Sequence, residues 1–167
     1  ETQGGPTENY SGIPDGVNDE GVLIFARNNI NSLSGTVQKD SVVTISSQRD
    51  IVITNHLRYQ NYNSTAPINA LGYANILGVF SVDGNVRIGT SAPNNIEIHG
   101  IVLAPHGIFT VDNYSSRPVQ GTATLLGGVI SDFYGPFGTF SGQTPRSGYG
   151  RNFVYDQRVL SGLTPPY

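Results

Sequence analysis

A four-residue pattern recurs along this chain: Asp or Asn, then Ile or Val, then any residue, then Ile. A second pattern is a Gly that opens a run of apolar or Thr residues. β-Branched runs are typical of strands, and Asn, Asp and Gly tolerate the sharp corners between strands. Short strands separated by such corners predict a β-solenoid, in which each coil covers the apolar residues of the previous coil. The first pattern stands at 50–53, 85–88 and 95–98, and the second at 21–24, 78–80, 107–109 and 128–130.

Strand-like runs cover most of the chain and favour an all-β fold. One helical turn within Ile68–Leu77 is the most helix that we expect, because no window combines a helical period with caps. The copies of the first pattern are unevenly spaced, so the coils differ in length. We therefore expect an irregular, right-handed parallel β-solenoid (β-helix) of few turns, with a β-sandwich as the alternative. The expected strands cover 22–25, 42–45, 50–54, 76–82, 86–88, 96–102, 108–111 and 122–130.

The 167 residues suffice for one domain with a sizeable core. Residues 1–20 are polar and loop-like, and we expect a flexible N-terminal arm there. Residues 21–167 form a single solenoid domain with a loop excursion at 57–75. The tail over 131–167 is dominated by Gly, Pro, Phe and Tyr. Because an open coil end exposes a section of core, we expect this tail to cap it; ligand binding by its aromatics is the alternative.

Composition excludes several classes of function. Charged residues make up only 13% of the chain, the net charge is −3, and Lys39 is the only lysine, which disfavours a general electrostatic clamp on nucleic acid. No cysteine is present, which excludes a disulfide framework, a cysteine zinc site and a thiol nucleophile. No apolar run is long enough to span a membrane.

Four residues form the candidate metal site: Glu97, His99, His106 and Asp112. Strand alternation places Ile96 and Ile98 inward and the side chains of residues 97 and 99 outward on one face. Zinc takes such nitrogen and oxygen ligands, but exposed polar strand residues are the alternative. The same alternation places Arg87 outward, where it would form a weak surface pair with Glu97.

A second candidate site lies in the Asn-rich excursion. Tyr59, Tyr62 and Tyr73 carry rings that stack on sugars or nucleic-acid bases, and Arg49 and Arg58 are close in sequence. No catalytic residue is predicted, because there is no Gly-x-Ser-x-Gly elbow and the twelve acidic residues are scattered. We expect no cofactor.

The order of the motifs resembles a β-rich domain of unknown function found in bacterial type IV pilin-like and competence-associated minor pilin proteins. The matching stretches are 21–29, 33–37, 42–45, 50–53, 76–79, 85–88, 95–100, 102–104, 107–109 and 127–130, then 148–150, 155–158 and 165–166 in the tail. The resemblance implies a β-solenoid on the bacterial cell surface, outside the cell, with pilus or filament subunits as partners. It supplies no catalytic residues. The sequence has no apolar pilin helix, so the helix was removed or the chain is anchored in another way.

These observations favour a non-catalytic extracellular module of a bacterial surface appendage, for display, adhesion or ligand capture. The ligands that we expect are DNA, as in DNA uptake, or a glycan. One alternative is a structural subunit of an extracellular filament, in which copies stack into a homo-oligomer. The other alternative is a polysaccharide-active β-helix enzyme, which would need two carboxylates that flank the scissile bond.

Overall fold

The computed structural model describes residues 21–60, 62–63 and 74–166. The described chain is all-β: ten strands share one sheet, and a short 3₁₀ helix follows them. No described helix has the length and apolar character needed to cross a membrane. The elements are β1 Val22–Ala26, β2 Ile30–Val37, β3 Val42–Ser47, β4 Ile51–Tyr59, β5 Ile76–Ser81, β6 Val86–Ile88, β7 Glu97–Val111, β8 Val119–Tyr134, β9 Gly138–Ser141, β10 Thr144–Tyr155 and η2 Gln157–Ser161.

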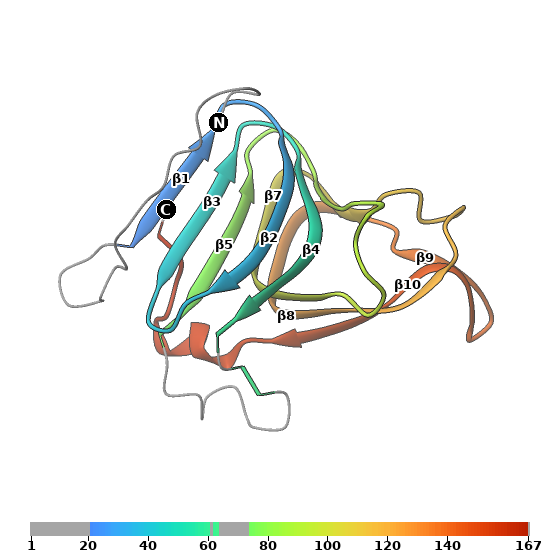
Figure 1. Cartoon of the computed structure of the whole chain (residues 1–167). Coiled ribbons are helices and arrows are strands. Elements are labelled where there is room, and N and C mark those ends of the chain that lie inside the picture. The colour runs from blue at the N-terminus through green and yellow to red at the C-terminus, as the bar shows by residue number, and fades with distance from the viewer. Residues whose placement is uncertain (1–20, 61, 64–73, 167) are drawn as a thin grey trace.

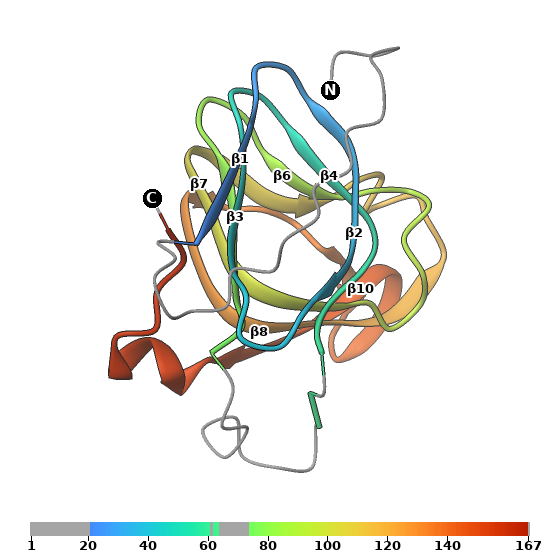
Figure 2. The same ribbon diagram turned by 60° about the vertical axis from the view of Figure 1, so that its left-hand side comes forward.

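Parallel pairing between successive coils organises the sheet. One side of the coil stacks β1, β3, β5, β7 and β8, and another stacks β2, β4, β6 and the end of β7. Only β9 and β10 pair antiparallel among the described strands. Figure 2 shows the coils one behind another in chain order, from β1 and β2 to β8 and β10. The prediction of an all-β, parallel, solenoid-like fold is confirmed, and the pairing is not that of an antiparallel sandwich.

Apolar side chains stack in columns through the core. Residues that share a column have the same position in successive coils, so each aliphatic group covers the one before it. Each fully buried aliphatic side chain contributes about 1.5–3 kcal/mol to folding. Two inward columns are Ile24, Ile45, Val79, Val102 and Val129, and Ile30, Ile51, Val86, Phe109 and Tyr134.

The recurring Asp or Asn forms a ladder at one corner of the coil. The side-chain oxygen of Asn29 accepts a hydrogen bond from Asp50 N at 3.2 Å, and that of Asp50 accepts one from Asn85 N at 2.8 Å. Asn85 in turn accepts from Ile108 N at 2.9 Å. These bonds satisfy backbone donors where the chain turns out of the sheet. The motif that predicted the fold therefore also joins its coils.

Glycine is required where the coils approach closely at this corner. A Cβ at Gly107 would lie 2.2 Å from the Gly84 carbonyl oxygen, closer than any side chain tolerates. The pattern of Gly before an apolar run therefore marks a backbone contact as well as a strand start.

Several elements differ from the expected ones. β2 was not expected, because its only aliphatic residues, Ile30, Leu33 and Val37, lack strict alternation. The runs at 96–102 and 108–111 are one strand, β7, which continues past a register shift beside β8. Ile76 and Leu77 begin β5 and are not helical. Residues 1–20 and 64–73, which include the expected arm and most of the excursion, lie outside the described residues.

The C-terminal strap, residues 156–166, runs back along the outside of the coil. Figure 1 shows this tail beside β5, β3 and β1. Pro165 packs on Gly78, so that a Cβ there would lie 3.0 Å from Pro165 Cβ, and Thr44 Oγ1 donates a hydrogen bond to the Pro166 carbonyl. The tail after residue 131 thus consists of the end of β8, the strands β9 and β10, and the strap on the outer face of the coil.

Candidate functional site

The coil ends in a groove at β8 and β10. β10 pairs with β8 only along Val119–Gly127, so no described strand pairs with the outer edge of β8 over 128–134. Because this last coil is incomplete, the core is open at its end. The resulting end groove has a volume of about 560 Å³. It is bounded by Phe109, Leu125, residues 127–135 of β8 and the turn after it, Phe137, and Arg151 and residues 153–155 of β10.

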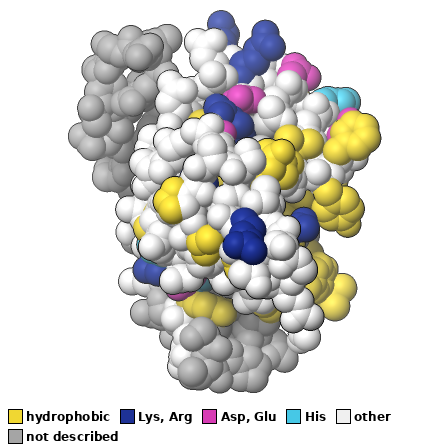
Figure 3. All heavy atoms as spheres, turned by 90° about the vertical axis from the view of Figure 1, so that its right-hand side faces the viewer, with side chains coloured by type: hydrophobic (Ala, Val, Ile, Leu, Met, Phe, Trp, Pro, Cys, Tyr) yellow, Lys and Arg dark blue, Asp and Glu magenta, His cyan; other side chains and the backbone are white. Residues whose placement is uncertain are grey.

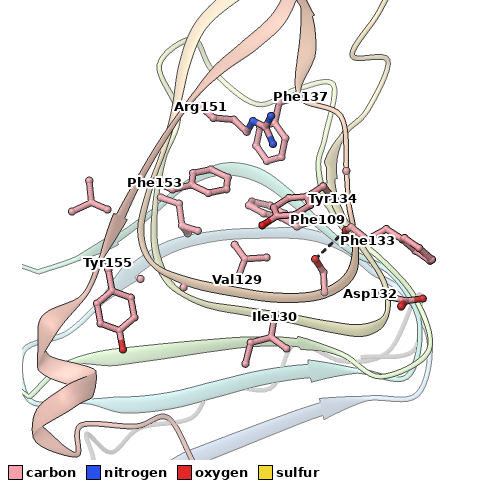
Figure 4. A pocket seen from close by; sticks show the side chains of 16 residues that line it. Phe109, Val129, Ile130, Asp132, Phe133, Tyr134, Phe137, Arg151, Phe153 and Tyr155 are labelled. Carbon is pink, nitrogen blue, oxygen red and sulfur yellow. Dashed lines mark hydrogen bonds between the residues drawn. The ribbon is translucent and has the colours of Figure 1, made fainter.

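Three phenyl rings form the interior of the end groove. The ring centroid of Phe137 lies 5.1 Å from that of Phe109 and 5.6 Å from that of Phe153, with both pairs edge to face. Figure 4 shows these rings and Val129 directed into the groove. The Arg151 guanidinium lies 5.7 Å from the Phe137 ring centroid, a cation–π contact at the rim. The interior is therefore apolar and aromatic.

Large apolar side chains at the end of β8 are exposed at the rim of the end groove. Ile130, Phe133 and Tyr134 are 60%, 69% and 93% exposed. Ile130 and Phe133 point away from the groove in Figure 4. Figure 3 shows hydrophobic side chains gathered along one edge of the face that it presents. Large exposed apolar patches are typical of interaction sites on protein surfaces.

The end groove combines an unpaired strand edge with an aromatic floor. An unpaired edge of β8 offers backbone donors and acceptors beside a floor of aromatic rings. Such an edge accepts an extended segment by strand addition, with the floor receiving its alternate side chains. Of the residues that line the groove, Asp132 and Arg151 alone carry charge.

The predicted metal ligands do not form one site. Glu97 pairs with Arg58 at 2.9 Å, and Asp112 pairs with Arg87 at 2.7 Å. His106 is exposed, and among the described residues it forms no ion pair with either acid. Within the described part of the chain, no group of three or more His, Cys, Asp or Glu side chains is arranged to hold a metal ion.

His99 is buried, so the prediction that its side chain is exposed is wrong. It is 1% exposed, because the rings of Tyr59 and Tyr62 pack against it with centroids 5.3 and 4.3 Å away. Its Nδ1 accepts a hydrogen bond from Tyr59 N at 3.0 Å. Burial lowers the pKa of His99 to about 4, against the opposing effect of the Glu97 carboxylate. His99 is thus neutral near pH 7 and joins β7 to β4.

The expected pair between Arg87 and Glu97 does not form. Arg87 instead donates to Asp112 at 2.7 Å, and its Nε lies 3.2 Å from an Asp50 oxygen without hydrogen-bond geometry. Glu97 pairs with Arg58 of β4. Both arginines therefore connect adjacent coils, because the strands that carry them are neighbours in the stack.

Two of the predicted stacking residues, Tyr59 and Tyr62, pack against other side chains of the described chain. Tyr59 is 3% exposed and lies under the Arg158 guanidinium, 4.9 Å from its ring centroid. Burial also raises the pKa of its hydroxyl. Tyr62 covers His99, Arg49 is exposed, and Tyr73 lies outside the described residues. The described members of the set do not form a platform for a ligand.

Two buried arginines were not found from the sequence. Arg158 makes a two-pronged ion pair with Asp156, whose Oδ2 lies 2.7 Å from Nη2, and donates to Asn75 at 3.2 Å. Arg117 donates to the Gly89 carbonyl at 3.2 Å and lies 5.0 Å from the Tyr149 ring centroid. Only the Asp-x-Arg spacing at 156–158 hinted at the first of these, because it fits a capped turn. The aromatic residues of the tail were identified, but as an expected cap.

In comparisons with protein-family models, curated proteins and solved structures, nothing matches the chain.

Proposed function

We propose that the chain is a non-catalytic extracellular module of a bacterial surface appendage, a right-handed β-solenoid that docks a partner subunit at the end groove. One observation carries the proposal: an aromatic, apolar groove and an unpaired strand edge lie together at the end of the coil. The first supplies burial and the second supplies directional hydrogen bonds, which are the two components of strand addition.

The positions of the charged groups support a non-catalytic role. Catalysis by acids and bases needs titratable groups that converge on one substrate position. Here Glu97 and Asp112 pair with arginines of adjacent coils, and Asp156 pairs with Arg158 of the same segment. These pairs make a rigid scaffold, which suits display.

The appendage setting comes from the resemblance to the pilin-like domain, whose partners are pilus or filament subunits. Capture of a glycan or DNA is the second candidate function. The exposed rings of Phe133 and Tyr134 favour it, because such rings stack on sugars and bases.

Dye binding tests whether the end groove is open and apolar. Anilinonaphthalene sulfonate fluoresces when it enters an apolar site, and we expect saturable binding to the folded chain at low micromolar concentration. The variant Val129→Lys should lose this binding because it places a charge inside the groove. Leu160→Lys is the matched control, since Leu160 is 78% exposed on η2 and does not line the groove. Equal dye binding by both variants, or no binding by the wild type, would contradict the proposal.

Competition against the bound dye separates the candidate partners. A partner subunit should displace it, whereas displacement by an oligosaccharide or single-stranded DNA would favour the second function. Immunogold labelling of intact cells with an antibody to the chain tests the setting. Gold along surface fibres is the expected result, and gold confined to the cell interior would refute it.

A further inference from the structure

We infer that the partner at the end groove is the first coil, β1 and β2, of a second copy of the chain, stacked head to tail. This inference rests on the proposed docking function and names its occupant. Its starting point is that both ends of the coil have unpaired edges. β1 pairs only with β3, and β2 only with β4, among the described strands.

The first coil also exposes apolar side chains. Leu23, Ile24 and Phe25 are 56%, 43% and 53% exposed. Alternation directs Ile24 toward the core, in the column that ends at Val129 in the groove. The same column of apolar side chains is therefore uncovered at both ends of the molecule, at Ile24 and at Val129.

The path of the chain makes the second copy a continuation of the first. β10 ends at Tyr155, beside Gly127, so the next unpaired position on the coil is Gly128. In each earlier coil, the residue that corresponds to Gly128 lies in the same column as Leu23 of β1. The column runs Leu23, Thr44, Gly78, Ile101 and Gly128. A second copy of β1 placed on 128–131 would extend it by one coil in the same parallel register.

Side-chain sizes agree with this register. Ile24 of the second copy would lie on Val129, and Ile30 on Tyr134, by the columns that join these positions within one chain. Within one chain, the column that begins at Gly35 ends at Phe153 of β10. Gly35 of the second copy would therefore lie over Phe153 of the first. Nothing lies within 4 Å of a Cβ position at Gly35, so there is space at this point for the phenyl ring.

Charge agrees as well. Phe25 and Ile130 share a column, and Arg27 and Asp132 each stand two places after these residues. Stacking would place the guanidinium of one copy opposite the carboxylate of the other, at an interstrand spacing of about 4.8 Å. Within one chain both side chains are exposed, and neither forms an ion pair with a described residue.

The contact uses two different surfaces, so it does not close on itself. Head-to-tail contacts of this kind produce open filaments and not closed dimers. We therefore expect the full chain to form linear assemblies whose length increases with concentration.

Sedimentation velocity of the full chain, from low to high micromolar concentration, tests this inference. Ile24→Lys blocks the first coil, and Val129→Lys blocks the end groove. Each variant alone should remain monomeric, because only one of its ends is competent. An equimolar mixture of the two should form a dimer and nothing larger, because one open groove then meets one open first coil.

Charge reversal tests the register. Arg27→Asp and Asp132→Arg should each weaken association about tenfold or more, and the double variant should recover it. Leu160→Lys should assemble like the wild type, and circular dichroism should show that every variant is folded.

Three outcomes would overturn the inference: a wild-type chain that stays monomeric at every concentration, blocked variants that still polymerise, or a mixture that does not dimerise. If the wild type stays monomeric but its groove binds the dye, the second copy is wrong as occupant and the docking function stands. If the groove binds no dye at concentrations where the chain is monomeric, the docking function itself fails.

Discussion

Arg158→Ala would release the C-terminal strap, and the structure indicates the cost. Asp156 is 1% exposed, and Arg158 contacts both of its carboxylate oxygens, at 3.0 Å from Nε to Oδ1 and 2.7 Å from Nη2 to Oδ2. Without the guanidinium, the buried carboxylate keeps the backbone N–H of residue 158 as its described donor. Removing one partner of a buried pair costs about 3–5 kcal/mol, because the other charge stays buried without compensation.

Arg58→Ala is the matched control. It also removes an arginine from an ion pair, but the side chains of Arg58 and Glu97 are 43% and 37% exposed. Water solvates the remaining carboxylate there, so the loss should be at most about 1 kcal/mol. A second variant, Asp156→Asn in the Arg158→Ala background, should regain part of the larger loss because it removes the stranded charge.

Urea unfolding followed by circular dichroism measures these differences from the midpoint and the slope. A domain of this kind has a total stability of about 5–15 kcal/mol, so the expected loss for Arg158→Ala is a large part of it. Equal losses of at most about 1 kcal/mol for Arg158→Ala and Arg58→Ala would refute the reasoning, since burial would then not distinguish the two pairs.

Three further predictions concern the contacts between coils. Gly107→Ala should lower the free energy of unfolding by about 2–4 kcal/mol, because the new Cβ meets the Gly84 backbone. Gly128→Ala is the control: no atom lies within 4 Å of its new Cβ, so the free energy of unfolding in the same urea assay should change little. His99 has a pKa of about 4 when folded and about 6.5 when unfolded, so the unfolded chain binds the proton more tightly and stability falls as the pH drops from about 6.5 to about 4. The expected loss is roughly 3 kcal/mol, and urea midpoints measured across this pH range give it. If stability depends on pH with the same slope in His99→Asn, the pH dependence does not come from His99. Asn85→Ala removes the acceptor for Ile108 N and should lower the free energy of unfolding by about 1–2 kcal/mol. Amide exchange at Ile108, measured by NMR, should become faster in this variant. Asn85→Asp keeps an acceptor oxygen and should leave that exchange slow.

Local pattern predicted the coil because the features that make it are local. Alternation in Asp50–Ile53 and Asn85–Ile88 already separates inward aliphatics from outward residues, and the corner residue stands one place before each strand. Stacking adds only the rule that equal positions lie above one another. The all-β, parallel, solenoid-like fold could therefore be predicted from the sequence.

Strand extents could not be predicted, because they depend on a partner. β2 contains Asn31, Ser32 and Ser34, which alone do not indicate a strand; it forms because β4 lies beside it. For the same reason, β10 extends far into a tail that was expected to cap the coil or to bind a ligand.

The candidate site shows the same limit. Alternation indicated the direction of the His99 side chain but not that Tyr62, from the excursion, would cover it. The groove aromatics Phe137 and Phe153 were visible in the sequence. Whether they close the coil end or line a groove depends on where β10 stops, and that is decided by its pairing with β8.

The distance across the stack tests the central claim, that successive coils lie in parallel register from the first coil to the end groove. Phe25 and Ile130 are outward and exposed, and the column that joins them passes through Ser46, Phe80 and Leu103. The chain has no cysteine, so Phe25→Cys and Ile130→Cys give two unique sites for spin labels.

Electron–electron double resonance on this labelled chain, diluted with excess unlabelled chain, measures the separation within one molecule. Four interstrand steps of about 4.8 Å separate the two labelled positions, so the distribution of distances between the labels should be narrow and centred at about 19 Å. A broad distribution, or one centred beyond about 30 Å, would contradict the parallel stack and the end groove that depends on it.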